Sequence, residues 1–393
     1  MSRPFPPEIL DLIVDHLHDE PVALKTCCAV SKSWVPRSRM YLFASVALDV
    51  HSGPTVESWM ETFPDPLNSP AHYTSTLRIL GIWPPEAASP WLRAFRNVVR
   101  LKIEDQFSLA PFCGLWPLLR SLHLESIPIP PCEIFGFVCS FPLLEDLALL
   151  DIQSKSIPPY EWNTPSTSPK LTGSLKLRVI RGVWATTRRL LDFPNGLHFT
   201  KIVLECDRDL DFKSTTDLVL ECSDTLEHLD VTYRLSGLFP SHLFLADTLL
   251  PRLDPTTISL DLSTATKLNA LVFRCTWQNV QWITMALRTV ESKDLQQIVL
   301  RPRVTTFANT VPELIHREWQ DLDRMLLQFW FSHSIRPKVA RGMEVLGASL
   351  RDCKLGLMPE LSARGLIDLV GDIPQSGPAE HGTTVSEKGT YIT

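Results

Sequence analysis

The sequence predicts an α/β protein with a short three-helix module at the N-terminus. An irregular solenoid should follow, with a parallel sheet on its concave side and helices on its convex side. Three observations predict this fold. The segment FPPEILDLIVDHL (5–17) concentrates large apolar residues at helical spacing. A short apolar phrase, L-x-x-L-x-L, recurs along most of the remaining chain. The 32 prolines outnumber the 16 glycines, which suits many short elements joined by defined turns.

Composition narrows the class of protein. The chain has 393 residues, of which 44% are hydrophobic and 21% charged, so it can bury a large core. A net charge of −6 argues against a general nucleic-acid surface, which would be basic. No secretory signal is visible, and no apolar run reaches the ~20 residues that a membrane span needs. The nine cysteines form no C-x-x-C pair, so we expect reduced thiols in a cytoplasmic or nuclear protein.

The first 45 residues are expected to form three short helices. Pro7 suits the first position of a helix, because its missing N–H costs nothing there. The acidic-Pro turn at 19–21 ends that helix and starts the second, and Pro36 kinks or restarts the third. So small a core leaves apolar surface for a partner to cover; the alternative is an ordinary subdomain packed against the rest of the chain.

The segment FPPEILDLIVDHLHDEPVALKTCCAVSKSW (5–34) resembles the F-box motif. The motif has an apolar-Pro pair, Glu-Ile-Leu, a helix ending in Leu, an acidic-Pro turn, Val-Ser and Trp. Phe5 replaces the usual leucine, and Pro36 lies where the third helix should continue. The resemblance implies binding to the Skp-type adaptor of a cullin-RING (SCF) ubiquitin ligase. The residues expected to face the adaptor are Pro6, Ile9, Ile13, Leu17, Leu24, Val30 and Trp34.

The recurring phrase predicts short strands whose leucines point inward. FASVALDV (43–50) predicts a further strand and GPTVESWMETF (53–63) a helix before the phrase begins. The first copies start about 21 to 25 residues apart, within the range of leucine-rich repeats, and later steps stretch or double. The copies are LRILGI (77–82), VVRLKI (98–103), LRSLHL (119–124), LEDLAL (144–149), FTKIVL (199–204), LEHLDV (226–231), LNALVF (268–273) and LQQIVL (295–300), with weaker ones around LKLRVI and TISLDL.

This pattern resembles a degenerate leucine-rich repeat without a firm asparagine ladder, as in many fungal F-box proteins. An antiparallel sandwich is the alternative, but its hairpins would recur every 8 to 12 residues or so. We therefore expect an F-box domain at 1–45 and a leucine-rich-repeat-like target-binding domain at 46–372. A disordered tail should follow at 373–393, where little can be buried.

Two elements are expected near the end of the predicted repeat domain. VPELIHREWQDLDRMLLQFWF (311–331) has strong helical periodicity, with Leu314, Trp319, Leu322, Leu326 and Phe329 on one side. It predicts the last large convex helix. Residues 359–370 are expected to form a final strand or cap.

No catalytic constellation can be read from the sequence. G-x-S-x-G, P-loop and G-x-G-x-x-G motifs are all missing. DRDLD (207–211) spaces three aspartates like the start of a calcium loop, but it lacks the central glycine and the later glutamate. We therefore expect a protein that is not an enzyme and holds no metal and no cofactor.

The outward-facing residues of the predicted strands are the candidate target surface. Successive side chains in a strand point to opposite faces, so the residues between the apolar positions should line the concave sheet. Their mixed charge favours a folded protein or peptide as the ligand over nucleic acid; the alternative is an ordinary solvated surface. The candidates are Arg100, Lys102, Glu104, His123, Glu125, Lys201, Glu205, His228, Asp230, Arg274 and Arg301, beside Ser121, Asp146, Thr232 and Gln297.

Two functions stay open. The first is the non-catalytic substrate-recognition subunit of an SCF-type ubiquitin ligase, which links a target protein to a cullin through the Skp-type adaptor. The second is a repeat-based scaffold that binds the adaptor without delivering ubiquitin. Both act through protein–protein interactions in the cytoplasm or nucleus, without contact to nucleic acid or membrane.

Overall fold

The computed structural model shows a mixed α/β protein that divides into two compact units. Unit 1 comprises Met1–Leu268 with Thr289–Ser292, and unit 2 comprises Asn269–Arg288 with Lys293–Thr393. The division falls inside the segment predicted as one repeat domain. The structure describes residues 6–49, 55–81, 89–152, 169–178, 183–206, 210–233, 260–276, 280–303, 313–333, 335, 338–340, 358–364 and 368–370. The predicted disordered tail at 373–393 lies outside these residues.

Unit 1 opens with three helices, α1 (Pro7–His16), α2 (Pro21–Val30) and α3 (Val35–Leu42). Each has a proline in its first turn, where the missing N–H breaks no helical hydrogen bond. Pro36 therefore neither kinks nor interrupts a helix, because α3 begins at Val35. Both α1 and α2 pack against α3.

The strands of unit 1 follow one another in space as they do in the chain, and every described pairing is parallel. An antiparallel sandwich is excluded for these strands. Their bounds are β1 (Ser45–Asp49), β2 (Thr76–Leu80), β3 (Arg100–Glu104), β4 (Ser121–Glu125), β5 (Asp146–Leu150), β6 (Ser174–Arg178), β7 (Lys201–Cys206) and β8 (His228–Tyr233).

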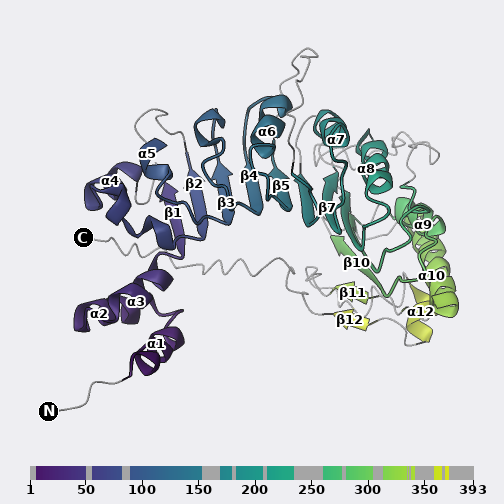
Figure 1. Ribbon diagram of the computed structural model, residues 1–393. Helices are drawn as coiled ribbons and strands as arrows, with labels where there is room; N and C mark the ends of the chain where they lie inside the picture. The colour runs from purple at the N-terminus through teal and green to yellow at the C-terminus, as the bar shows by residue number, and fades with distance from the viewer. Residues whose placement is uncertain are drawn as a thin grey trace, which may run out of the picture. The chain divides into compact units, whose positions relative to one another are not determined.

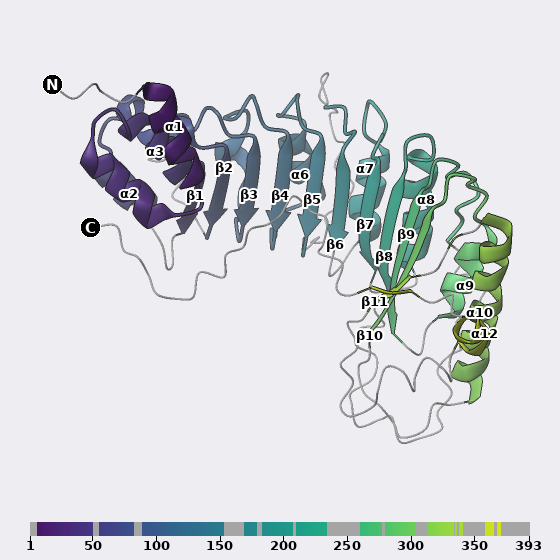
Figure 2. The same cartoon turned by 90° about the horizontal axis from the view of Figure 1, so that it is seen from below.

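The helices of unit 1 that follow β1 lie along one face of this sheet (Figure 1). The opposite face of β2 to β7, seen in Figure 2, has none of the described helices of unit 1 over it. The connecting elements are α4 (Val56–Thr62), η1 (Pro66–Asn68), η2 (Pro70–Tyr73), α5 (Ser89–Leu92), η3 (Ala110–Phe112), α6 (Pro131–Val138), α7 (Val183–Leu191) and α8 (Leu210–Glu221).

The core of unit 1 lies between the sheet and these helices. The second and fourth residues of β2 to β6, such as Leu122 and Leu124, are buried, whereas their neighbours on the other face are half-buried or exposed for the most part. Trp116 and Phe141 precede β4 and β5 at equivalent places, and their rings stack with centroids 6.5 Å apart. Each is followed by a proline, in the segments LWPLL and SFPLL that lead into the strands.

One backbone joint recurs where the strands begin. In front of β2 to β5, β7 and β8, a single carbonyl oxygen of the preceding repeat accepts hydrogen bonds from two consecutive N–H groups. The Val99 oxygen accepts from Arg120 (2.9 Å) and Ser121 (3.0 Å). The Arg120 oxygen accepts in turn from Glu145 (2.8 Å) and Asp146 (2.9 Å). At these strands the joint fixes the register with main-chain atoms alone; at β6 the Glu145 oxygen accepts only from Gly173, and the Asp146 carboxylate accepts the second N–H, that of Ser174.

A second recurring feature ends the strands. The residue after β2, β3, β4 and β5 has a positive φ, which glycine adopts freely and asparagine or aspartate more readily than most residues. Its N–H donates to the carbonyl of the last residue in the next strand, as Ser126 does to Leu150 at 2.9 Å. The four residues are Gly81, Asp105, Ser126 and Asp151, with φ of 84°, 55°, 55° and 54°.

The strand register corrects the alignment of the first repeat. Leu77 pairs with Leu101, not with Val98, so LRILGI was aligned three residues late. The buried Thr74 takes the first apolar position of that copy. The weak copy TISLDL is wrong as a strand in its described part, because residues 260–262 lie in no strand although Leu260 and Leu262 are buried.

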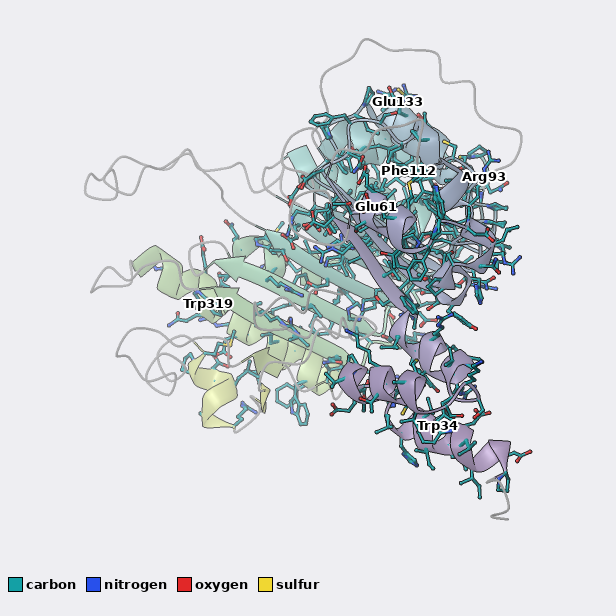
Figure 3. The ribbon with its side chains drawn as sticks, turned by 90° about the vertical axis from the view of Figure 1, so that its left-hand side faces the viewer. Trp34, Glu61, Arg93, Phe112, Glu133 and Trp319 are labelled. Atoms are coloured by element: carbon teal, nitrogen blue, oxygen red, sulfur yellow. The ribbon has the colours of Figure 1, made fainter. Side chains whose placement is uncertain are left out.

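Unit 2 contains further parallel strands and the longest described helix. Strands β9 to β12 pair in chain order, and α10 packs against α9 and α12. The predicted face of α10 is confirmed for Trp319 (labelled in Figure 3), Leu322, Leu326 and Phe329, because all four are buried. The side chain of Leu314 lies outside the described residues. The elements are β9 (Ala270–Thr276), α9 (Gln281–Arg288), β10 (Gln297–Arg303), α10 (Glu313–His333), β11 (Lys338–Ala340), α12 (Pro359–Ala363) and β12 (Asp368–Val370).

The predicted cap at 359–370 contains a short helix, α12, and then the strand β12. The carboxylate of Asp323 on α10 accepts hydrogen bonds from the N–H groups of Glu360 (2.8 Å) and Leu361 (3.1 Å). It thus satisfies donors at the start of α12 that have no partner within the helix.

Gly173 gives a test of the joint between β5 and β6. The carboxylate of Asp146 accepts from the N–H (2.6 Å) and the hydroxyl (2.7 Å) of Ser174. A Cβ on Gly173 would collide with that carboxylate. We expect Gly173→Ala to lower the free energy of unfolding by about 1–3 kcal/mol, measured by urea denaturation, because it breaks these bonds.

Gly136 in α6 is the matched control. A Cβ there meets no atom within 4 Å. Since glycine costs roughly 0.5–1 kcal/mol in a helix relative to alanine, Gly136→Ala should leave stability unchanged or raise it. Equal effects of the two substitutions would contradict the role given to Gly173.

Candidate functional site

One face of α1 carries exposed apolar side chains. Ile9 and Ile13 are each 42% exposed and Leu12 is 59% exposed. Their spacing of three and four residues puts them side by side on the helix, with the exposed Pro6 just before its first turn. The opposite side of α1 is anchored by Val14, which is 1% exposed. The helix therefore has two apolar faces, one packed within the module and one open.

The other residues predicted to face the adaptor lie in different surroundings. Val30 is 65% exposed at the end of α2, while Leu17 and Trp34 are half-buried. Trp34 immediately precedes α3 and lies within the helical module (Figure 3). The prediction of Leu24 as a surface residue is wrong: it is 1% exposed, because it points into the small core formed with α3. Leu12 was not predicted, although it is three residues from Ile9.

A polar cluster joins α1 to α3. The Arg37 guanidinium donates to both carboxylate oxygens of Asp15, at 2.6 and 2.8 Å, and the Tyr41 hydroxyl donates to the same carboxylate at 2.8 Å. These hydrogen bonds, first that from Arg37 and then that from Tyr41, lower the pKa of Asp15 to about 2. Asp15 therefore fixes the helix whose other side carries Ile9 and Ile13.

The predicted target residues do lie in register on one face of the sheet. Lys102 is paired with His123, Glu104 with Glu125, and Lys201 with His228. The first, third and fifth residues of successive strands thus form three rows that run across the strands of unit 1. Arg100 begins β3 in the first row and is exposed.

Ion pairs connect the second and third rows. Arg78 donates to both oxygens of Glu104, at 2.6 and 3.2 Å. The Lys102 ammonium lies 3.2 Å from Glu104 and 2.9 Å from Glu125. His123 Nε2 is 3.3 Å from the same oxygen of Glu125. Burial alone would raise the pKa of Glu104, but the hydrogen bond from Arg78 and the nearby Lys102 outweigh it, so the pKa is lowered.

The network continues to β6 across an apolar residue. Arg178 lies 3.7 Å from Glu125 and also donates to Asp151 in the turn after β5, with Nε at 2.8 Å. Leu150 stands between Glu125 and Arg178 in the register and is buried although its side chain is on the uncovered face. The bridge over Leu150 explains that burial.

The remaining candidates differ in accessibility. Asp230 is 6% exposed and Thr232 is also buried, so the prediction that Asp230 is open to a ligand is wrong. Glu205 and Arg178 are register partners on β7 and β6. Arg274 and Arg301 belong to unit 2, where they are register partners on β9 and β10.

Several residues of this face were missed. Arg78 was not predicted because the first repeat was aligned three residues late. Lys176 and Arg178 were not predicted because LKLRVI was treated as a weak copy. The regular polar residue between two leucines, as in LRI, LKI, LHL and LKL, is the signal that identifies them.

The described residues contain no group of three His, Cys, Asp or Glu side chains that could hold a metal ion. Asp207 and Asp209 of the weighed calcium loop lie outside the described residues, and Asp211 follows the start of α8. Among the described helices, none is long and apolar enough to cross a membrane.

Comparison with protein-family models finds no match to this chain, and the search of curated proteins finds none either.

Asp15 gives a test of the helical module. Asp15→Asn removes the charge that Arg37 binds, so α1 should separate from α3 more often. We expect faster hydrogen–deuterium exchange of the α1 amides, while the strands of unit 1 keep their protection. Asp11→Asn is the control, because Asp11 is exposed on the same helix. Equal exchange in both variants would show that Asp15 does not hold α1.

The same cluster sets a dependence on pH. The folded-state pKa of about 2 lies below the ordinary value near 4, so the charged carboxylate stabilises the module above pH ~4. This contribution is lost as the pH falls from ~4 toward ~2. An NMR titration of the Asp15 carboxyl carbon should give the low pKa, and an ordinary value would contradict the cluster.

Proposed function

We propose that this chain is the substrate-recognition subunit of an SCF-type ubiquitin ligase. Residues 1–45 act as an F-box that binds a Skp-type adaptor and, through it, a cullin. The following α/β region acts as an irregular leucine-rich-repeat solenoid that holds a target protein. The chain itself performs no chemistry, and it works in the cytoplasm or nucleus.

The observation that carries this proposal is the open apolar face of α1. Two isoleucines and a leucine stay exposed on a ten-residue helix whose other side is already anchored by Val14 and Asp15. Fully burying such a side chain stabilises a complex by about 1.5–3 kcal/mol. Because each isoleucine is 42% exposed, covering the pair and Leu12 contributes a few kcal/mol on that scale. Such a surface is more stable when covered by a partner with an apolar groove than when left in water, and this favours an adaptor-binding role.

The repeat reading is supported by the sheet. Parallel strands that pair in chain order, most of them preceded by the same carbonyl joint, form when similar segments stack side by side. The register positions Thr76, Arg100, Ser121, Asp146, Ser174, Lys201 and His228 give steps of 21 to 28 residues, which suit leucine-rich repeats.

Replacing the two isoleucines tests the adaptor surface. We expect Ile9→Asp combined with Ile13→Asp to weaken capture of a purified Skp-type adaptor by about 100-fold or more, measured by calorimetry. The change removes two apolar contacts and places two charges where water would be excluded. Both side chains point outward, so the far-ultraviolet circular dichroism should be unchanged.

Leu67→Asp is the matched control, because Leu67 is an equally apolar residue that is 89% exposed on η1. It should bind the adaptor normally. Normal binding by the folded double variant would reject the F-box assignment. Co-purification of the cullin with the adaptor separates a ligase subunit from a scaffold that binds the adaptor alone.

A further inference from the structure

The charges on the uncovered face of the sheet in unit 1 are not all used in the same way. Each carboxylate on the described strands β1 to β8 has a partner. Glu104 and Glu125 bind Arg78 and Lys102, and Asp146 binds Ser174. The strand carboxylates Asp49, Glu205 and Asp230 also make interactions. Each acidic side chain of these strands therefore already has an interaction, although the buried Oε2 of Glu205 accepts no hydrogen bond.

Two cations on these strands differ from the rest. Among the residues that the structure describes, the side chains of Arg100 and Lys176 have no hydrogen-bonding or ion-pair partner, whereas those of Arg78, Lys102 and Arg178 are paired. Asp105, in the turn after β3, lies at the opposite end of that strand from Arg100. The strands β1 to β8 carry equal numbers of Lys/Arg and Asp/Glu residues, but the charged side chains left without a partner are both cations.

The neighbours of Lys176 explain why its ammonium group stays unpaired. Its register partners are Ala148 on β5 and Val203 on β7, which offer no oxygen at their side chains. Lys176 itself is half-buried. A cation beside apolar neighbours is less well hydrated than one in open solvent, so an incoming carboxylate gains more from pairing with it.

The two cations have a defined spacing. Arg100 is the first residue of β3, and Lys176 is the third residue of β6, three strands away. With about 4.8 Å between strands and about 3.3 Å per residue along them, their Cα atoms are about 16 Å apart. An extended chain covers that distance in about five residues. On the two strands between them, this face carries Ser121 and His123 on β4 and Asp146 and Ala148 on β5. The small side chains of Ser121 and Ala148 leave room for a backbone, and the Asp146 carboxylate is held by Ser174.

We propose that the uncovered face of β3 to β6 binds an acidic segment of the target protein, with two carboxylates about five residues apart that pair with Arg100 and Lys176. This deepens the proposed function, on which it rests, by naming the chemical class of the target. The paired side chains between the two cations form a rigid surface. This surface repels carboxylates that are not aligned with Arg100 and Lys176.

A labelled synthetic peptide tests the proposal. The probe is a twelve-residue Gly/Ser peptide with two glutamates five positions apart, and its partner peptide has glutamine at both places. We expect the glutamate peptide to bind the full chain in low-salt buffer by fluorescence anisotropy, and the glutamine peptide to bind at least about fivefold more weakly. Equal binding of the two peptides overturns the proposal.

Charge reversal locates the site. Arg100→Glu combined with Lys176→Glu should weaken binding of the glutamate peptide by about tenfold. The control is Arg93→Glu combined with Lys213→Glu, two exposed cations on the helical side of unit 1 that change the net charge equally. Equal loss in the two double variants would show a response to net charge alone, and would overturn the proposal.

Two further arms separate the other outcomes. A single-stranded DNA oligonucleotide that binds more tightly than the peptide, and loses binding in the same variant, would assign the face to nucleic acid instead. Capture of the Skp-type adaptor is measured on the same proteins and should be equal in all of them. If the unaltered chain fails to capture the adaptor, the proposed function fails, while the peptide result still decides the acidic site.

Discussion

A shared backbone carbonyl at the start of most strands is the constraint on which the rest of unit 1 depends. Because the Val99 oxygen accepts two consecutive N–H groups, Arg120 and Ser121 cannot shift by one residue without losing a bond. A shift of one residue would also turn Leu122 and Leu124 away from the helices and expose them. The joint therefore keeps the leucines in the core and, by the same register, lines up the charged side chains on the other face. Ion pairs such as that between Lys102 and Glu125 are a result of this alignment, not its cause.

The two candidate surfaces follow different physics. The open face of α1 is apolar, so covering it releases water from hydrocarbon and gives affinity with little demand on geometry. The sheet face is polar and mostly paired, so it gives little affinity to a ligand of the wrong pattern and repels wrongly placed charges. The first surface suits a partner that stays the same, and the second suits a choice among many partners. The proposed function requires this division, because the receptor would hold the adaptor through α1 and select a target protein through the sheet.

Most of the repeated strands and the starts of the first two helices could be predicted from the sequence, because both depend on local patterns. Pro7 and Pro21 mark the first turns of helices, and the leucines of LRSLHL give β4 directly. Contacts between residues that are far apart in the sequence could not be predicted from local patterns. Asp15 meets Arg37 across 22 positions, and no spacing rule connects them. Thr74 stands in a buried apolar position, so the phrase could not be aligned there. Leu24 is as apolar as Ile9. It is buried and Ile9 is exposed only because of which side of each helix α3 covers.

The left-handed residue after the strands has a consequence for how such a chain changes its length. Asp105, Ser126 and Asp151 have the same positive-φ backbone geometry. The segments 106–126 and 127–151 are therefore bounded by equivalent residues. Copying or deleting one such stretch in the gene would leave matching edges on both sides, since the joints between neighbours use main-chain atoms. Each event would lengthen or shorten the sheet by about 4.8 Å. Gain or loss of a repeat would therefore change the distance from the N-terminal helices to a residue such as Lys176 in fixed steps.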